Sequence, residues 1–289
     1  MRLAAALLLL PALTGCGALA DSGTGVQVAA GFYPLQYVAE RVAGNRADVE
    51  VLTQPGGEPH DATLSVRETA LVAEADVVVV AGGVQPAVDD AVASAVEDGT
   101  VVDTSSPGFE TKNAPRIRPD DPHFWLDPLL MADLGDAVAE ALADTDPQHA
   151  DAYRDHAADL RRDLQRLDRA YADGLADCAR STVVVSHDAF GYLDRYGLEF
   201  APIAGLSPGA EPTPADLSRL QDLIRAQGIT TVFSERLVNP RVAETLADDV
   251  GVETAVLDPV EGLTDQTRDE DYLSLMRANL AALEEANGC

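Results

Sequence analysis

Short runs of valine and other apolar residues, each followed by a segment with helical spacing, recur along both halves of the chain. The runs are VQVAAG, VEVLT, DVVVVAGG and TVVDTS in the first half, and STVVVSHD, LEFAPIAG, ITTVFSE and VETAVLDP in the second. Continuous β-branched runs are typical of strands that are buried on both faces, as in parallel sheets covered by helices. The pattern therefore predicts an α/β fold with one parallel sheet in each half.

A segment of about 30 residues between the two halves has uninterrupted helical spacing. Asp146 and Pro147 are a favourable pair for the start of a helix, and Ala, Leu and Tyr residues then recur at intervals of three and four. A helix of this length is roughly 45 Å long. The sequence therefore predicts two α/β lobes, residues 26–145 and 178–289, joined by one long helix at residues 146–177.

The N-terminus has the features of an export signal. Arg2 precedes an apolar stretch of eleven residues, which is too short to span a bilayer that needs about 20. This predicts a signal peptide at residues 1–15, followed by a linker at residues 16–25. The motif LTGC, which ends at Cys16, resembles a bacterial lipobox, so we expect Cys16 to carry acyl chains at the outer face of the cytoplasmic membrane. An ordinary signal peptide, and hence a periplasmic protein, is the alternative.

The two remaining cysteines form an even pair in an exported chain. Cys178 lies just before a predicted strand, and Cys289 is the last residue after a predicted helix. An oxidising compartment favours a disulfide between them, and two free thiols are the alternative. Neither cysteine has a second thiol close in sequence, which argues against a zinc site made of cysteines.

The charge of the chain limits its partners. The 289 residues include 20 Lys and Arg against 49 Asp and Glu, and the formal net charge is −29. Such a surface repels nucleic-acid phosphates and anionic lipid headgroups, so neither is expected as a direct partner.

Three histidines and one aspartate lie where predicted strands give way to the following segment. They are His60 in GGEPHDATLS, His123 in DPHFWLDP, His187 in VVVSHDAF and Asp258 in TAVLDPVEGL. Ligands of open α/β sheets bind beyond the carboxyl ends of the strands. Three imidazoles and one carboxylate suit a divalent metal of intermediate softness, and zinc above all.

Other polar residues take supporting roles in this hypothesis. Three aspartates that are close in sequence to the histidines could orient the imidazole rings: Asp61, Asp127 and Asp188. Glu58 and Glu235 are further acids near the predicted site, and neither is predicted to be a ligand. The remaining histidines, His149 and His156, lie seven residues apart on the long helix and are expected at its solvated surface.

The order of the motifs FYPL, GGEPHDATLS, DPHFWLDP, SHDAFGYL, FSE and LDPVEGL resembles the metal-binding lipoproteins of bacterial zinc and manganese ABC transporters, which are solute-binding proteins. The resemblance covers about residues 26–287. It implies two Rossmann-like lobes, a long rigid helix between them and a metal site in the cleft between the lobes. It also implies the ligands His60, His123, His187 and Asp258, no catalysis, and delivery of the metal to an ABC permease subunit in the membrane.

The third histidine bears on the choice of metal. Manganese-type members of the family resemble one another in having a glutamate at the position of His187, and three imidazoles with one carboxylate favour zinc. We therefore predict a Zn²⁺-binding protein of the zinc-uptake type, with manganese as the alternative. The segment SPGFETKNAPRIRPDDP is short and contains no histidine, which argues against an auxiliary metal-scavenging loop.

Two further functions remain open from the sequence. An exported zinc hydrolase would use Glu58 or Glu235 as general base with a metal-bound water, although the chain contains no HExxH motif. A cell-adhesion protein with a structural metal would unfold when the metal is removed. The solute-binding protein is expected to be a monomer, and loading of its site by a metallochaperone is left open.

Overall fold

The computed structural model describes residues 25–96, 99–109, 111–112, 118 and 120–289. The predicted signal peptide, the acylation site at Cys16 and nearly all of the linker lie outside this part of the chain. None of the described helices combines the length and the apolar character that crossing a membrane requires.

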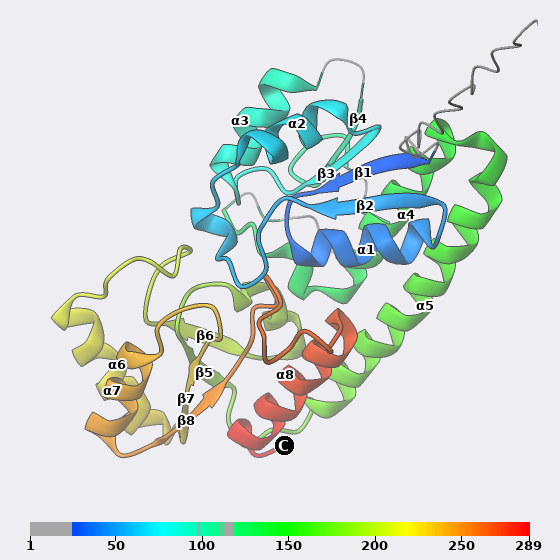
Figure 1. Cartoon of the computed structure of the whole chain (residues 1–289). Coiled ribbons are helices and arrows are strands. Elements are labelled where there is room, and N and C mark those ends of the chain that lie inside the picture. Colours follow the sequence, from blue (N-terminus) through cyan, green and yellow to red (C-terminus); the bar gives the residue numbers. More distant parts are fainter. Residues whose placement is uncertain (1–24, 97–98, 110, 113–117, 119) are drawn as a thin grey trace, which may run out of the picture.

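The first lobe is a parallel four-stranded sheet with helices on both faces (Figure 1). Its strand order is β2-β1-β3-β4. The strands are β1 (Val26–Ala30), β2 (Ala47–Val51), β3 (Val77–Val80) and β4 (Thr100–Asp103), and the helices between them are α1 (Tyr33–Ala43), α2 (Val66–Glu74) and α3 (Pro86–Ala95). The predicted parallel sheet of this half is confirmed.

The four valines of β3 show why the sheet is buried on both faces. Val77 and Val79 pack into the main hydrophobic core, whereas Val78 and Val80 pack into a smaller cluster on the opposite face. Side chains alternate between the two faces of a strand, so an unbroken valine run fits only a strand that is covered on both sides.

The second lobe repeats this arrangement. Its sheet is also parallel, with the order β6-β5-β7-β8. The strands are β5 (Thr182–Val185), β6 (Glu199–Pro202), β7 (Thr231–Ser234) and β8 (Glu253–Val256), and the helices are α6 (Pro214–Gln227), α7 (Arg241–Val250) and α8 (Tyr272–Asn287). In each lobe the second strand pairs with one edge of the first strand, and the third strand pairs with its other edge. Open α/β sheets bind ligands at such a point, where the strand order reverses.

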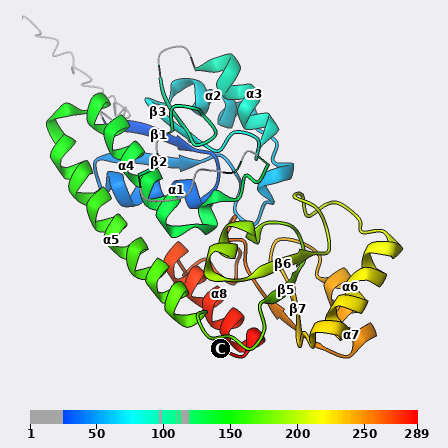
Figure 2. The ribbon, with the colours of Figure 1, turned by 180° about the vertical axis from the view of Figure 1, so that it is seen from behind.

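One long helix, α5 (Ala150–Gly174), connects the lobes. α4 (Pro128–Thr145) packs along α5, and α5 continues past the first lobe to lie beside α8 of the second (Figures 1 and 2). α5 has 25 residues and is shorter than the predicted helix at 146–177. The difference arises because the residues Pro147–His149 form a separate 3-10 turn and the helix ends at Gly174.

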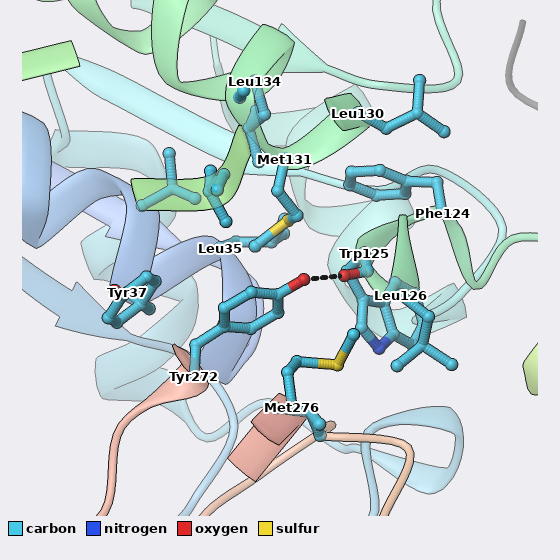
Figure 3. Close-up of a cluster of buried hydrophobic side chains, with 14 of the residues drawn as sticks. Leu35, Tyr37, Phe124, Trp125, Leu126, Leu130, Met131, Leu134, Tyr272 and Met276 are labelled. Carbon is cyan, nitrogen blue, oxygen red and sulfur yellow. Dashed lines mark hydrogen bonds between the residues drawn. The ribbon is translucent and has the colours of Figure 1, made fainter. Parts of the chain in front are cut away.

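The lobes share one hydrophobic core, which contains buried side chains from α1, α4, α5 and α8. Figure 3 shows Tyr272 of α8 pointing into the first lobe, where its hydroxyl donates a hydrogen bond to the Trp125 carbonyl at 2.6 Å. The ring of Tyr272 also stacks on Tyr37 of α1, with centroids 5.4 Å apart. Burial of each large apolar side chain contributes about 1.5–3 kcal/mol, so a wide rotation of one lobe against the other is unfavourable.

The C-terminus is attached to the second lobe in two ways. Cys178 and Cys289 form a disulfide across a sequence separation of 111 residues, the pairing that the sequence favours. The backbone amides of Ala179 and Arg180 also donate hydrogen bonds to the carbonyls of Gly288 and Asn287. The end of α8 is thereby fixed beside the start of β5.

We expect the double variant Cys178→Ser, Cys289→Ser to lose about 2–4 kcal/mol of the free energy of unfolding. The disulfide closes a long loop and so reduces the entropy of the unfolded chain. Urea denaturation of the mature chain, followed by circular dichroism, measures the loss. An unchanged midpoint with an unchanged slope would show that the bridge does not stabilise the fold.

Candidate metal centre

Four side chains bring one donor atom each to a single point between the lobes. They are His60, His123, His187 and Glu261, and their donor atoms all lie within 4.8 Å of one another. His60 and His123 belong to the first lobe, and His187 and Glu261 to the second. The structure thus brings together the three histidines that the sequence predicts, with a different carboxylate.

The first lobe positions its two imidazoles on short 3-10 turns. His60 lies on the turn Pro59–Asp61 beyond β2, where the carboxylate of Glu58 accepts a hydrogen bond from the His60 backbone amide at 3.1 Å. His123 immediately precedes the turn Phe124–Leu126, and its Nδ1 lies 2.8 Å from Asp121 Oδ1. Because a carboxylate holds Nδ1–H, Nε2 is left free to bind a metal.

The second lobe positions His187 two residues beyond the end of β5. Its Nδ1 lies 2.7 Å from Oε1 of Glu235, which directly follows β7, and the Ser186 hydroxyl also donates to Glu235. The Nε2 atom of His187 therefore points toward the other donors, as that of His123 does. The supporting role that the sequence allowed for Glu235 agrees with this contact.

The spacing of the donors fits a tetrahedral zinc ion. Glu261 Oε1 lies 3.6 Å from His60 Nε2, 3.8 Å from His123 Nε2 and 3.6 Å from His187 Nε2. The Nε2 atoms of His60 and His123 are 3.3 Å apart. Zinc at about 2.0–2.1 Å from each of four ligands separates neighbouring ligand atoms by about 3.3–3.4 Å.

The donors are buried, and two of them have no hydrogen bond within the protein. His123 and His187 are fully buried, Glu261 is 1% exposed, and the His60 side chain is 10% exposed. Nε2 of His187 and Oε1 of Glu261 are buried without a hydrogen bond. Buried polar atoms are nearly always hydrogen-bonded. Unpaired atoms that face one another therefore indicate that a ligand binds between them, and nitrogen and oxygen donors fit a metal cation.

The predicted ligand Asp258 does not join this group. Its Oδ1 accepts a hydrogen bond from the Val260 amide at 2.8 Å, and its Oδ2 lies 3.1 Å from Nε of Arg236. The prediction of Asp258 is therefore corrected to Glu261, three residues further along the chain. The physical reason is that Asp258 uses its carboxylate to hold a turn, and this turn directs Glu261 toward the imidazoles.

A local signal for this correction is present in the motif LDPVEGL. Aspartate readily accepts a hydrogen bond from the amide two residues later, and an Asp-Pro pair favours turns. The longer side chain of Glu261 is free of such a local partner. The sequence alone does not reveal the direction in which the turn runs, because that depends on contacts with distant residues.

The predicted orienting aspartates have other roles. Asp127 accepts hydrogen bonds from the first amides of α4 and pairs with Arg195 at 2.9 Å. The carboxylate beside His123 is that of Asp121, which is not among the aspartates predicted from the sequence. Asp188 and Asp61 make no hydrogen bond to a ligand imidazole among those that the structure describes. Asp61 lines a cavity of about 370 Å³ beside the site, together with Glu58 and Glu235.

The two histidines of the long segment take no part in the centre, as predicted. His149 Nδ1 lies 2.6 Å from Asp146, and His156 Nδ1 lies 2.9 Å from the Val42 carbonyl. Each is half-buried rather than fully solvated. Both have structural contacts near the ends of α1 and α4.

A larger hollow lies next to the centre. It has a volume of about 970 Å³ and lies between the lobes, with Glu235, Glu261 and Arg236 in its wall. Of the four donor residues, only Glu261 lines this hollow.

Comparison with known proteins places the chain in a family. Residues 28–286 match the family model described as zinc-uptake complex component A, periplasmic. The chain belongs to this family. The resemblance in the motifs is therefore confirmed across nearly the whole described chain.

Individual members of the zinc-uptake component A family show the same similarity. The zinc-binding lipoprotein AdcA of Streptococcus pneumoniae serotype 4 is 32% identical over 292 residues, which cover 94% of this chain and 58% of AdcA. The chain thus spans a little over half the length of that relative.

Solved structures of the family have the same fold. The Zn(II)-bound ZnuA-like domain of Streptococcus pneumoniae AdcA is 30% identical, with a TM-score of 0.78 over 92% of this chain and 100% of that one. The laminin-binding protein Lmb of Streptococcus agalactiae, described as a bifunctional protein with adhesin and metal-transporting activity, has 29% identity and a TM-score of 0.81 over 91% of this chain and 99% of Lmb. The predicted α/β fold with two parallel-sheet lobes is confirmed.

The electrostatics of the centre couple metal binding to protons. Burial alone disfavours a charged imidazole, but the carboxylates of Glu235 and Glu261 outweigh it and raise the pKa of His187 to about 10. Burial likewise disfavours a charged Glu261, but the imidazoles of His187 and His60 lower its pKa to about 2. Glu261 is therefore ionised at all ordinary pH values, and His187 holds a proton that a metal must displace.

We expect zinc binding at pH 8 to release about one proton per chain, and zinc affinity to rise as the pH approaches 10. An imidazole with an ordinary pKa of about 6.5 would have lost its proton at pH 8. In the metal-free protein, protonated His187 stabilises the fold fully below about pH 6.5, and this contribution is lost as the pH rises through about 10.

Isothermal titration calorimetry at pH 8, in buffers that differ in their enthalpy of protonation, measures the number of protons released. Zinc binding without proton release at pH 8 would contradict the raised pKa of His187.

Proposed function

We propose that this chain is an extracytoplasmic solute-binding protein that captures Zn²⁺ and delivers it to an ABC-type metal importer. The observation that carries the proposal is the convergence of three imidazoles and one buried carboxylate, two from each lobe, with Nε2 of His187 and Oε1 of Glu261 unpaired. Membership of the zinc-uptake component A family supports the same function.

The donor set favours zinc over manganese. Imidazole nitrogen suits zinc, whereas manganese prefers carboxylate, carbonyl and water oxygens. With His187 in place of a second carboxylate, the centre offers three nitrogens and one oxygen. The Zn(II)-bound structure of the similar AdcA domain is in line with this choice.

Four protein donors favour storage of the ion over catalysis. A catalytic zinc keeps an open position for water, whereas a site with four protein ligands is closed. Glu58 and Glu235, the bases that a hydrolase would use, instead contact the backbone of His60 and the ring of His187. A family of transport components, not of enzymes, agrees with this arrangement.

Release of the ion follows from the division of the ligands between the lobes. A small separation of the lobes would pull His60 and His123 away from His187 and Glu261, and it would not require unfolding of either sheet. The proposed partner that causes this separation is the permease subunit of the importer. We further propose that the mature chain is exported and anchored through Cys16, where the predicted lipobox ends.

We expect Glu261→Gln to lower zinc affinity by more than about 100-fold and Asp258→Asn by less than about 10-fold. The first variant removes a ligand charge, and loss of even an orienting partner of a ligand costs about 10–100-fold. The second retains an oxygen that can accept the hydrogen bond from the Val260 amide. Competition with a chromogenic zinc chelator gives both affinities, and a greater loss in Asp258→Asn would restore Asp258 as the ligand.

We expect His187→Glu to reduce the preference for zinc over manganese by at least about tenfold, because it creates a site with two imidazoles and two carboxylates. Competitive titration of the mature chain with both metals, with metal analysis of the purified protein, measures the preference. His149→Glu is the matched control, since His149 lies outside the centre and should leave the preference unchanged. Equal preferences in His187→Glu and the parent protein would mean that His187 does not select the metal.

A further inference from the structure

The ligand Glu261 lies on a turn that several buried contacts fix from outside. The side chain of Asn279 on α8 pairs with the backbone of Asp258: Oδ1 accepts from the Asp258 amide at 2.9 Å, and Nδ2 donates to the Asp258 carbonyl at 2.6 Å. The indole Nε1–H of Trp125 donates to the Pro259 carbonyl at 2.8 Å. The carboxylate of Asp258 closes the turn through the Val260 amide.

The backbone of this turn is strained. Val260 has a φ of 60°, and it is the one residue other than glycine with a positive φ among the described residues. A β-branched side chain disfavours that conformation, and such strain persists only where the surroundings impose it. Val260 is fully buried, so the contacts of Asn279 and Trp125 with its two predecessors hold the conformation that directs Glu261.

Trp125 belongs to the other lobe and lies two residues after the ligand His123. It is fully buried, its ring meets the His123 ring edge-on with centroids 5.1 Å apart, and its own carbonyl accepts the hydrogen bond from Tyr272. One side chain of the first lobe thus contacts both a ligand of its own lobe and the turn that carries the ligand of the other.

We propose that Trp125 and Asn279 are positioning residues of the metal centre, which hold Glu261 in place through the turn at Asp258–Val260. This inference rests on the proposed metal-binding function. Neither residue contributes a donor atom to the centre. Trp125 acts across the lobe interface, and Asn279 acts from α8 within the second lobe.

The mechanism rests on two hydrogen bonds to backbone carbonyls. If the indole donor is lost, the Pro259 carbonyl is left buried and unpaired, and the strained turn can relax toward an ordinary φ. Glu261 then no longer meets the three imidazoles at the distance that a tetrahedral ion requires. Zinc dissociates faster, while the fold and the three imidazoles stay in place.

The test uses Trp125→Phe, which keeps a large aromatic ring and removes the donor, and Asn279→Ala, which removes the pair with Asp258. We expect each to bind zinc about tenfold more weakly, as is typical for loss of a buried hydrogen bond. Tyr153→Phe is the matched control, because it removes a buried aromatic donor to Asp146 Oδ2, at 2.8 Å, at the start of α5 and away from α8. It should destabilise the protein without changing zinc affinity.

A double-mutant cycle with Glu261→Gln separates positioning from general destabilisation. If Trp125 acts through Glu261, Trp125→Phe weakens zinc binding in the parent protein and has no further effect in the Glu261→Gln background. An equal loss in both backgrounds, or an equal loss in Tyr153→Phe, would overturn the inference. The visible spectrum of bound Co²⁺ gives a second readout, since Trp125→Phe should change it toward that of Glu261→Gln.

The outcomes distinguish this inference from the proposed function. Failure of the parent protein to bind one zinc ion would refute the proposed function itself. Tight zinc binding by the parent, with an effect of Glu261→Gln but none of Trp125→Phe or Asn279→Ala, would refute only the positioning role. If Trp125→Phe does not fold, Asn279→Ala in the same cycle decides the question.

Discussion

The hydrophobic core that extends through both lobes fixes the positions of the side chains in the metal centre. Tyr272 of α8 reaches into the first lobe, and α5 lies against both lobes. Two sheets that shared only a flexible hinge would hold their ligands at variable distances. Because the lobes share a core, the four donor atoms, two from each lobe, lie within 4.8 Å of one another.

The rigid core also holds the polar groups that compensate the buried charge of the centre. A carboxylate that is 1% exposed, as Glu261 is, is costly to bury unless positive charge or hydrogen bonds compensate it. Here the compensation comes from imidazoles, and two of these are in turn held by Asp121 and Glu235. Glu235, which fixes the ring of His187, also raises the pKa of that imidazole, so a proton and a metal compete for His187.

The sequence predicts the parallel sheets and the three histidines because both depend on local pattern. Valine runs identify strands buried on both faces, and histidines at strand ends indicate a site at the edge of a sheet. The fourth ligand could not be predicted in this way, since Asp258 and Glu261 are both acids near the end of β8. The choice depends on Asn279 and Trp125, which are distant in sequence. The length of α5 was overestimated because Pro147 begins a 3-10 turn rather than the helix itself.

The identical strand order of the two lobes has a consequence for assembly. Each lobe has a complete sheet with its own helices, yet each contributes only two of the four donors. Two donors hold a metal far less tightly than four, so neither half retains the ion by itself. A metal ion is therefore retained at this centre only when both halves are folded and packed against each other.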